Sequence, residues 1–424
     1  MNIPNVSRSK KVSKRIFLWL SIAGFTGIGC MQAVAETPRE IHESLLVMDS
    51  HLDTPALLIQ PDFDIMARHD PLQDGSQVDF PRMQEGGLDG GFWVIFSRQG
   101  PLTAKDFHKS RDTAMLRALA IHKMTAAHPD VFEIATRSDD GPRIHAAGKR
   151  VVYLSIENSY PLGEDISLLK TFYDLGVRMV GPVHFANNQF GDSSTDTKGQ
   201  EWQGLSPLGE KLVVEANRLG MILDGSHAHD DLVRQMIEQS KTPIVLSHSG
   251  AKSIFDHPRN VPDDILLKLA ETGGVIQMNA FSSYLTKLPD NPERTKAFKE
   301  LRAEVSAAGN PTEAQASAFR AKQREINATY PPALASFEEY MDHFLYVLKL
   351  IGPEHVGVSG DFDGGGGVED LYDIAAFPHL SARLLKEGYS KADLEKIWGG
   401  NLLRLLSKAE AYAATASEAV TPGS

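Results

Sequence analysis

The chain has 424 residues, of which 42% are hydrophobic and 23% charged, a composition that excludes a disordered or fibrous protein. Its net charge of −12 argues against nucleic acid or an anionic membrane surface as a partner. A chain of this length can bury a large core, either as one large domain or as two ordinary ones.

The first 35 residues have the pattern of an export signal. Basic residues at positions 8–15 precede an apolar stretch at 16–29, and Ala33-Val34-Ala35 provides a small-residue cleavage site. Because the apolar stretch is too short for a membrane span, we expect cleavage after Ala35 and a periplasmic protein without an integral membrane segment. Lipid anchoring at Cys30 is the less favoured alternative, and the choice between the general and twin-arginine export routes stays open. Cleavage would remove Cys30, the only cysteine, so the mature protein would contain no disulfide.

From residue 36 to residue 412, apolar segments rich in β-branched residues alternate with helical patterns. We expect eight strands, at residues 45–53, 90–97, 151–157, 177–184, 221–227, 243–248, 274–279 and 355–361. Helices are expected at residues 39–44, 167–175, 208–219, 230–239, 262–272, 380–387 and 390–411. Strands and helices in this alternation favour an α/β protein with a closed (β/α)8 TIM barrel. An open doubly wound sheet is the alternative.

The segment 285–345 is longer than a connection between two strands requires. It is charged, it has helical periodicity at residues 294–307 and 313–326, and Asn310-Pro311 and Pro331-Pro332 interrupt it. We interpret it as a helical insertion between strands 7 and 8, at the rim of the barrel. Residues 413–424 are mostly small and polar, and we expect them to form a disordered tail.

Side chains that bind metals or transfer protons stand at the ends of seven of the eight predicted strands. They are His51 with Asp53, Glu157, His184, His227, His248, Asn279 and Asp361. In a barrel the carboxyl ends of the strands surround one mouth, where the active site lies. A single histidine there is more often structural, but so many at one level favour a metal centre. Other histidines, including His42 and His343, fall on loops or helix faces and are interpreted as structural or exposed.

The number of candidate ligands argues for two metal ions. A catalytic zinc ion uses three protein ligands, whereas this chain offers five, namely His51, Asp53, Glu157, His227 and His248. Five ligands suit two ions that share a carboxylate: His51 and Asp53 on one ion, His227 and His248 on the other, and Glu157 bridging. Two ions about 3.5–4 Å apart can hold a hydroxide and polarise a carbonyl, which is the chemistry of hydrolysis.

The same motifs resemble those of the membrane (renal) dipeptidase family, which are binuclear zinc peptidases on amidohydrolase-like barrels. The resemblance covers about residues 40–410 and rests on Asp49-Ser50-His51-Leu52-Asp53, Glu157, Asp224-Gly225-Ser226-His227, Ser247-His248-Ser249, Arg259-Asn260-Val261-Pro262-Asp263-Asp264 and Gly360-Asp361-Phe362-Asp363-Gly364. The loops at 158–161 and 364–367 depart from the family pattern, so the resemblance does not imply a preference for particular substrate side chains.

The resemblance implies the same five zinc ligands and adds roles for other residues. His184 would hydrogen-bond the oxygen of the scissile carbonyl, and Asp361 would act as general base and acid. Arg259 and Tyr284 would receive the terminal carboxylate of a dipeptide.

We therefore expect an exported dipeptidase that uses two Zn²⁺ ions and a metal-bridging hydroxide to hydrolyse dipeptides with a free C-terminal carboxylate. A related amide or lactam hydrolase is the alternative, because Arg259 would also bind the carboxylate of N-acyl amino acids or carbapenem-like substrates. A metal-free dipeptide-binding protein is disfavoured by the five ligands. The sequence leaves open whether the protein forms a homodimer.

Overall fold

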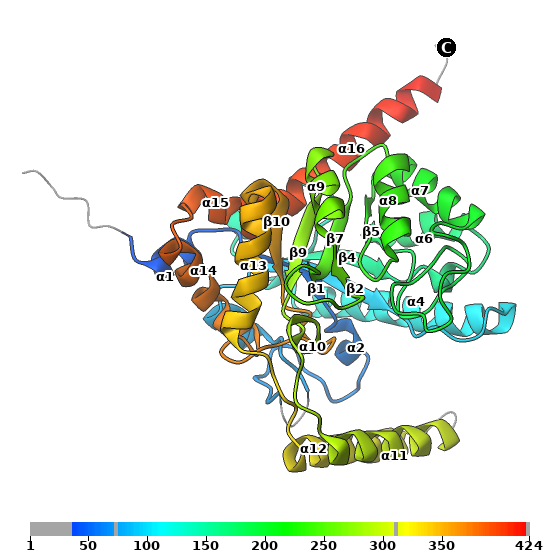
Figure 1. Ribbon diagram of the computed structural model, residues 1–424, viewed down its shortest axis with the longest axis vertical. Helices are drawn as coiled ribbons and strands as arrows, with labels where there is room; N and C mark the ends of the chain where they lie inside the picture. Colours follow the sequence, from blue (N-terminus) through cyan, green and yellow to red (C-terminus); the bar gives the residue numbers. More distant parts are fainter. Residues whose placement is uncertain (1–35, 72–74, 309–312, 421–424) are drawn as a thin grey trace, which may run out of the picture. The chain divides into compact units, whose positions relative to one another are not determined.

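A computed structural model describes residues 36–71, 75–308 and 313–420 of the chain (Figure 1). The predicted export signal, with Cys30 and the cleavage site after Ala35, lies outside the described residues. Among the helices that are described, none is long and apolar enough to cross a membrane.

The described strands pair in parallel and form two sheets. The first has the order β1 (Met48–Leu52), β2 (Gly90–Phe96), β4 (Arg150–Glu157), β5 (Val177–Val180) and β6 (Ile222–Leu223), with β3 (Phe132–Ile134) paired to β4. The second has the order β10 (Val356–Ser359), β9 (Val275–Asn279), β7 (Val245–Ala251) and β8 (Asn260–Val261). Parallel bridges between Asp224 and Val245 and between Leu52 and Phe362 join the sheets at both edges. The result is one curled parallel sheet, which confirms the predicted α/β class.

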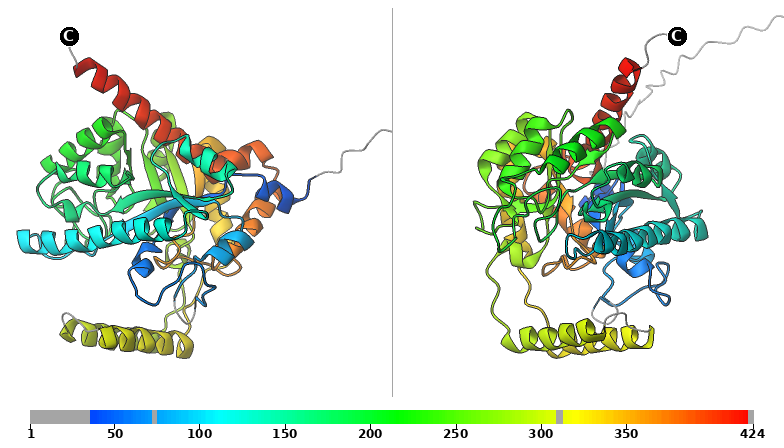
Figure 2. Two further views of the ribbon diagram at one scale, coloured as in Figure 1. Left: turned by 180° about the vertical axis from the view of Figure 1, so that it is seen from behind. Right: turned by 90° about the vertical axis from the view of Figure 1, so that its right-hand side faces the viewer.

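The longest strands, β2 and β4, are buried along nearly their whole length because both of their faces are covered. In β2 every residue from Gly90 to Ile95 is buried, and in β4 every residue from Val151 to Glu157 is buried. Helices cover the outer face of the curled sheet (Figures 1 and 2). Neither strand alternates apolar and polar residues, as a half-exposed strand would.

Six predicted helices are present with ends shifted by a few residues. They are α1 (Pro38–Glu43), α6 (Leu168–Asp174), α7 (Pro207–Leu219), α8 (Asp230–Gln239), α9 (Asp263–Glu271) and α14 (Phe377–Lys386). Helix α4 (Ala104–Ala127), which has 24 residues and packs against β2, was not predicted from the sequence. Leu116 and Leu119 on this helix are 59% and 58% exposed, so apolar residues lie on both of its faces and blur the helical periodicity.

Residues 285–345 contain the expected pair of packed helices, α11 (Pro292–Ala308) and α12 (Glu313–Thr329). Figure 2 shows that two extended segments connect this pair to the rest of the fold. The next helix, α13 (Phe337–Ile351), begins at a capping box of Ser336 and Glu339 and packs against β7 and β10. It therefore covers the sheet, and the helical pair ends earlier than the expected residue 345. The backbone N–H of Ala335 donates to Ser282 Oγ at 3.0 Å, so the two ends of the segment lie together.

The chain continues through α15 (Lys391–Glu395), a π-helical turn (Lys396–Gly400) and α16 (Asn401–Val420). The tail expected to be disordered from residue 413 is helical as far as Val420, and residues 421–424 lie outside the described part. Five alanines between residues 409 and 416 explain the difference, because alanine has the highest helix propensity.

Candidate metal centre

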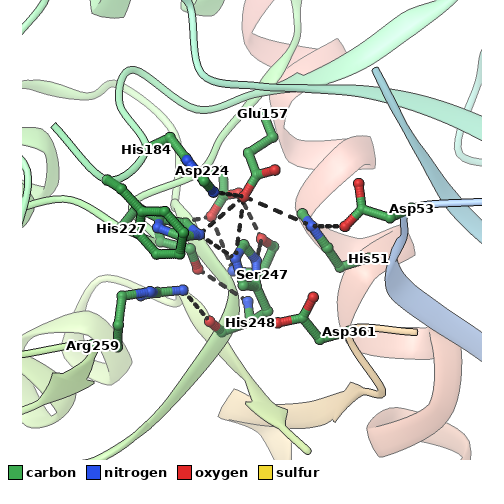
Figure 3. A network of polar contacts seen from close by, with 12 residues as sticks. His51, Asp53, Glu157, His184, Asp224, His227, Ser247, His248, Arg259 and Asp361 are labelled. Carbon is green, nitrogen blue, oxygen red and sulfur yellow. Dashed lines mark hydrogen bonds and ion pairs between the residues drawn. The ribbon is translucent and has the colours of Figure 1, made fainter. Parts of the chain in front are cut away.

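The polar side chains predicted at the strand ends converge at one edge of the curled sheet (Figure 3). His51 lies in β1, Glu157 ends β4 and His248 lies in β7. His184 and His227 lie in loops beyond the ends of β5 and β6, which are shorter than expected. These loops still direct both imidazoles toward Glu157.

The Glu157 carboxylate is the centre of this cluster. Its Oε1 lies 2.9 Å from Nε2 of His227, 3.4 Å from Nε2 of His248, 3.7 Å from Nε2 of His184 and 3.8 Å from Nε2 of His51. The Oδ2 atom of Asp53 lies 3.4 Å from Nε2 of His51. The five predicted metal ligands are each 8% exposed or less.

The donor atoms fit a divalent cation. Three overlapping groups have ligand atoms within 4.8 Å of one another, namely His51 with Glu157 and His248, Glu157 with His184 and His227, and His51 with Asp53 and Asp361. Nε2 of His227 lies 2.8 Å from Nε2 of His248, and the buried Nδ1 of His227 has no hydrogen-bond partner among the described residues. Imidazole and carboxylate donors in this combination suit zinc. The groups contain all five predicted ligands and also His184 and Asp361.

Burial favours the neutral form of most titratable groups in the cluster. It lowers the pKa of His184 to about 3 and the pKa values of His227 and His248 well below the usual range. Burial also raises the pKa of Glu157 and Asp361. For His51 burial acts in the other direction, but the nearby carboxylates, Glu157 foremost, raise its pKa to about 10. His184, His227 and His248 are therefore in the neutral form that binds a metal ion, whereas a bound cation would have to displace the protons that His51 and the buried carboxyl groups hold without it.

Side chains behind the ligands hold β6 and β7 in position. Ser247 Oγ donates to Asp224 Oδ2 at 2.6 Å and lies 2.8 Å from Nδ1 of His248. Asp224 Oδ1 accepts hydrogen bonds from the backbone N–H groups of Ser226 and Ser247, both at 2.9 Å. A partner at Nδ1 fixes the ring orientation of a ligating histidine, so Ser247 and Asp224 orient His248.

A second set braces β1. Asp49 Oδ1 accepts the backbone N–H of His51 at 2.9 Å, and its Oδ2 accepts that of Gly360 at 2.8 Å. Ser50 Oγ donates to the carbonyl of Ser247 at 2.6 Å. Asp49 and Ser50 stand in one of the sequence motifs, but no role was predicted for either. The signal that could have identified them is a fully buried polar side chain inside an apolar strand.

Two site residues have a left-handed backbone, which is rare for residues other than glycine. His227 has φ 67° and Asp361 has φ 52°. The Asp361 carboxylate accepts a hydrogen bond from Asn279 Nδ2 at 3.0 Å. Asn279, which was predicted at the end of its strand, therefore positions the Asp361 side chain.

The residues predicted to contact substrate lie next to the cluster. Nη2 of Arg259 donates to the carbonyl of His248 at 3.0 Å, and the guanidinium carbon lies 5.4 Å from the centre of the Tyr284 ring. Nε of Arg259 is buried without a hydrogen-bond partner among the described residues. The His184 ring lies between Phe96 and Phe185, with ring centres 4.7 and 4.0 Å away.

A cavity of about 690 Å³ opens onto this cluster. Its walls include Asp53, Glu157, His184, His227, His248, Tyr284 and Asp361, together with Arg98, Arg117 and Arg302. None of these three arginines was predicted, because they come from a loop after β2, from the missed helix α4 and from α11. Side chains that reach the cavity from a helix or loop far along the chain cannot be identified from the residues at a strand end.

Comparisons with known proteins agree with this geometry. Residues 35–420 match the sequence pattern of the membrane dipeptidase family, peptidase family M19. Dipeptidase tcpJ of Claviceps purpurea is 31% identical over 84% of this chain and 74% of its own. Dipeptidase aclJ of Aspergillus oryzae is 32% identical over 81% of this chain and 72% of its own. The crystal structure of the probable dipeptidase PvdM from Pseudomonas aeruginosa is 28% identical, with a TM-score of 0.72 over 88% of this chain and 98% of that chain.

Proposed function

The chain belongs to the membrane dipeptidase family of metallopeptidases, and we propose that it is a dinuclear zinc dipeptidase acting on dipeptides with a free C-terminal carboxylate. The observation that carries this proposal is the position of Glu157, whose single carboxylate is approached by four imidazoles in a buried cluster. A carboxylate in this position can bridge two cations, and each cation then has imidazole ligands on its own side.

We assign His51 and Asp53 to one zinc ion, His227 and His248 to the other, and Glu157 to both. Bound in this way, the two ions would supply an activated water molecule and polarise the scissile carbonyl. The ring of His184 is held neutral by burial, so its N–H can donate to the carbonyl oxygen as negative charge develops there. Asp361, oriented by Asn279, takes a proton from the attacking water and delivers it to the leaving amine.

Arg259 and Tyr284 are proposed to hold the terminal carboxylate of the substrate. Arg259 is 3% exposed, and its Nε has no partner among the described residues, so it can bind a carboxylate without losing a bond to water. Its link to the His248 carbonyl ties this clamp to a metal ligand. The distance from clamp to metals would then select substrates two residues long.

The finer features of the fold are part of the proposal. We infer a (β/α)8 barrel over residues 36–412, with α11 and α12 as an insertion at its mouth between the seventh and eighth barrel strands. Residues 1–35 are proposed as a cleaved export signal on their basic and apolar pattern, with a periplasmic destination. Sequencing the amino terminus of the secreted protein would test the cleavage site.

A paired substrate assay tests the proposed function. Zinc-loaded protein is expected to hydrolyse dipeptides and to act poorly on the same dipeptides with an amidated C-terminus. Arg259→Lys keeps the charge but loses the two-pronged geometry, so kcat/KM on free dipeptides should fall by about 10- to 100-fold. Activity on the amidated dipeptide should hardly change. An equal loss on both substrates would mean that Arg259 supports the loop rather than the carboxylate.

A further inference from the structure

We propose that Arg117 binds a second carboxylate, carried by the N-terminal half of the substrate, so that the enzyme prefers substrates that are acidic in both halves. This inference rests on the proposed dipeptidase function and adds the class of its substrate.

Arg117 is a cation in the wall of the active-site cavity, and within the described part of the chain it forms no ion pair; Asp53 and Glu157 act on its charge only from a distance. It extends from α4 and lies with its guanidinium carbon 5.5 Å from the centre of the Phe96 ring. Its Nε and Nη1 atoms are buried, and no described residue hydrogen-bonds them. Burial lowers its pKa, since water cannot solvate the charge fully. An ionised group left in this state is costly unless a ligand supplies the missing partner.

The position of Arg117 is opposite that of the Arg259 clamp. Helix α4 packs against β2, whereas Arg259 directly precedes β8, which pairs with β7. Around the curled sheet, β4, β5 and β6 separate β2 from β7 on one side, and β1, β10 and β9 separate them on the other. A dipeptide bound through its C-terminus at Arg259, with its carbonyl near Glu157, would therefore direct its N-terminal residue toward Arg117.

Apart from the three acids of the proposed metal centre and Asp363, the charged residues in the cavity wall are arginines. Asp53, Glu157 and Asp361 belong to the proposed metal centre. Asp363 already accepts hydrogen bonds from Thr54 Oγ1 at 2.7 Å and from the backbone of Gln77 at 2.6 Å. The remaining charged groups in the lining are Arg117 and the exposed Arg98 and Arg302, in a chain whose net charge is −12. Such a local field attracts anionic substrates.

Two chemical groups could supply this second carboxylate. One is the side chain of an N-terminal Asp or Glu residue in a dipeptide. The other is a dicarboxylic acyl group such as succinyl on an amino acid, which also lacks the ammonium group that Arg117 would repel. Comparing Glu-Ala with N-succinyl-alanine identifies the preferred source, while the role of Arg117 is decided by comparing substrates with and without the second carboxylate.

The test compares kcat/KM on Glu-Ala and Gln-Ala, which differ by one charge at nearly equal size. Wild-type protein should prefer Glu-Ala by about 10- to 100-fold, the range of a charge-assisted hydrogen bond. Arg117→Met keeps an unbranched apolar side chain but removes the guanidinium over Phe96, so it should abolish this preference, while Arg117→Lys should retain part of it. Arg111→Met is the matched control, because Arg111 lies on the same helix but donates to the Pro161 carbonyl and does not line the cavity.

Equal kcat/KM for the two dipeptides in wild-type protein, or a preference that survives Arg117→Met, would overturn the inference. If neither dipeptide were hydrolysed, the proposed dipeptidase function would fail instead. In that case the affinities of the two intact dipeptides, measured by calorimetry on wild-type and Arg117→Met protein, still decide the role of Arg117.

Discussion

Two sets of histidines are buried to the same degree in this protein, but their surroundings differ. His42 and His343 are 0% exposed, and His227 and His248 are 4% and 2% exposed. The rings of His42 and His343 use both nitrogens: His42 contacts Ser381 Oγ and the Gly86 carbonyl, and His343 contacts the backbone N–H of Ala251 and the Leu285 carbonyl. His227 and His248 direct their Nε2 atoms at each other and at Glu157.

The difference is the one expected between a structural histidine and a histidine that binds a metal ion, as we propose for His227 and His248. A neutral imidazole has one donor and one acceptor, and His42 and His343 have a partner for each. Nitrogens that face one another around a carboxylate compete for the same protons, so a cation satisfies them better than hydrogen bonds do. Burial alone does not distinguish the two sets, whereas the identity of the partners does.

The largest effect is expected from Glu157→Gln, which tests whether the histidines around Glu157 bind metal ions. An amide cannot neutralise two cations, so the protein should lose zinc, and kcat should fall by about 10³-fold or more, since the metals supply several kcal/mol of transition-state stabilisation. Metal per chain is measured by atomic emission. Glu133→Gln, in a carboxylate that pairs with Arg143 and Lys149 on the surface, is the control and should keep both metals. Two zinc ions per chain in Glu157→Gln would contradict the bridging role.

His184→Ala should separate a catalytic histidine from a ligand. If His184 only donates to the developing oxyanion, both metals stay and kcat falls by about 10²–10³-fold. Steady-state kinetics and metal content are measured on one preparation. His122→Ala serves as the control, because His122 bonds the Leu175 carbonyl away from the cavity. Loss of a zinc ion from His184→Ala would instead make His184 a ligand.

His42→Leu tests the structural set. It leaves Ser381 Oγ and the Gly86 carbonyl without their buried partner, so the free energy of unfolding should fall by about 1–3 kcal/mol. Metal content and kcat of the folded protein should stay unchanged. Denaturant titration of the wild type and the variant measures the difference. A variant that lost zinc at unchanged stability would show that the two sets are not independent.

The smallest expected effect is a pH dependence that His42 contributes to stability. Burial lowers the pKa of His42, so below about pH 6.5 the unfolded chain binds a proton that the folded chain does not. The contribution is present above that pH and is lost as the pH falls toward the folded-state pKa, by at most about 1.4 kcal/mol per pH unit. Denaturant titrations from pH 7.5 to 5 should therefore show a steeper loss for the wild type than for His42→Leu. Parallel curves would assign the slope to other groups.

Much of the cluster around Glu157 could be predicted because a buried parallel strand is recognisable in the sequence as an apolar run, and a polar residue marks its end. The mostly apolar run of β4 ends at Glu157, and the same pattern placed His51 and His248 on strands. The strands preceding His184 and His227 were predicted too long. The loop from Gly181 to Val183 is buried and apolar like a strand, and residues 224–227 are buried although three of them are polar.

The cavity wall could not be predicted in the same way. Arg117 reaches the cavity because α4 packs on β2. Hydrophobic periodicity does not reveal which helix packs on which strand, and the periodicity of α4 itself is blurred by its exposed leucines. Arg302 lies on α11, a helix that was predicted at the rim of the barrel, but no residue of this helix was predicted to line the cavity. Local patterns identify strand ends, while contacts between distant helices depend on the whole fold.

The hydrogen bond between Ser282 and Ala335 has a consequence for how this mouth can change over evolution. Since the chain departs and returns at nearly one point, everything between can be shortened, lengthened or exchanged for another loop while β9, β10 and the ligands beneath keep their places. Grafting a short turn in place of residues 286–334 is therefore the natural way to redesign which molecules enter, leaving the reaction itself untouched.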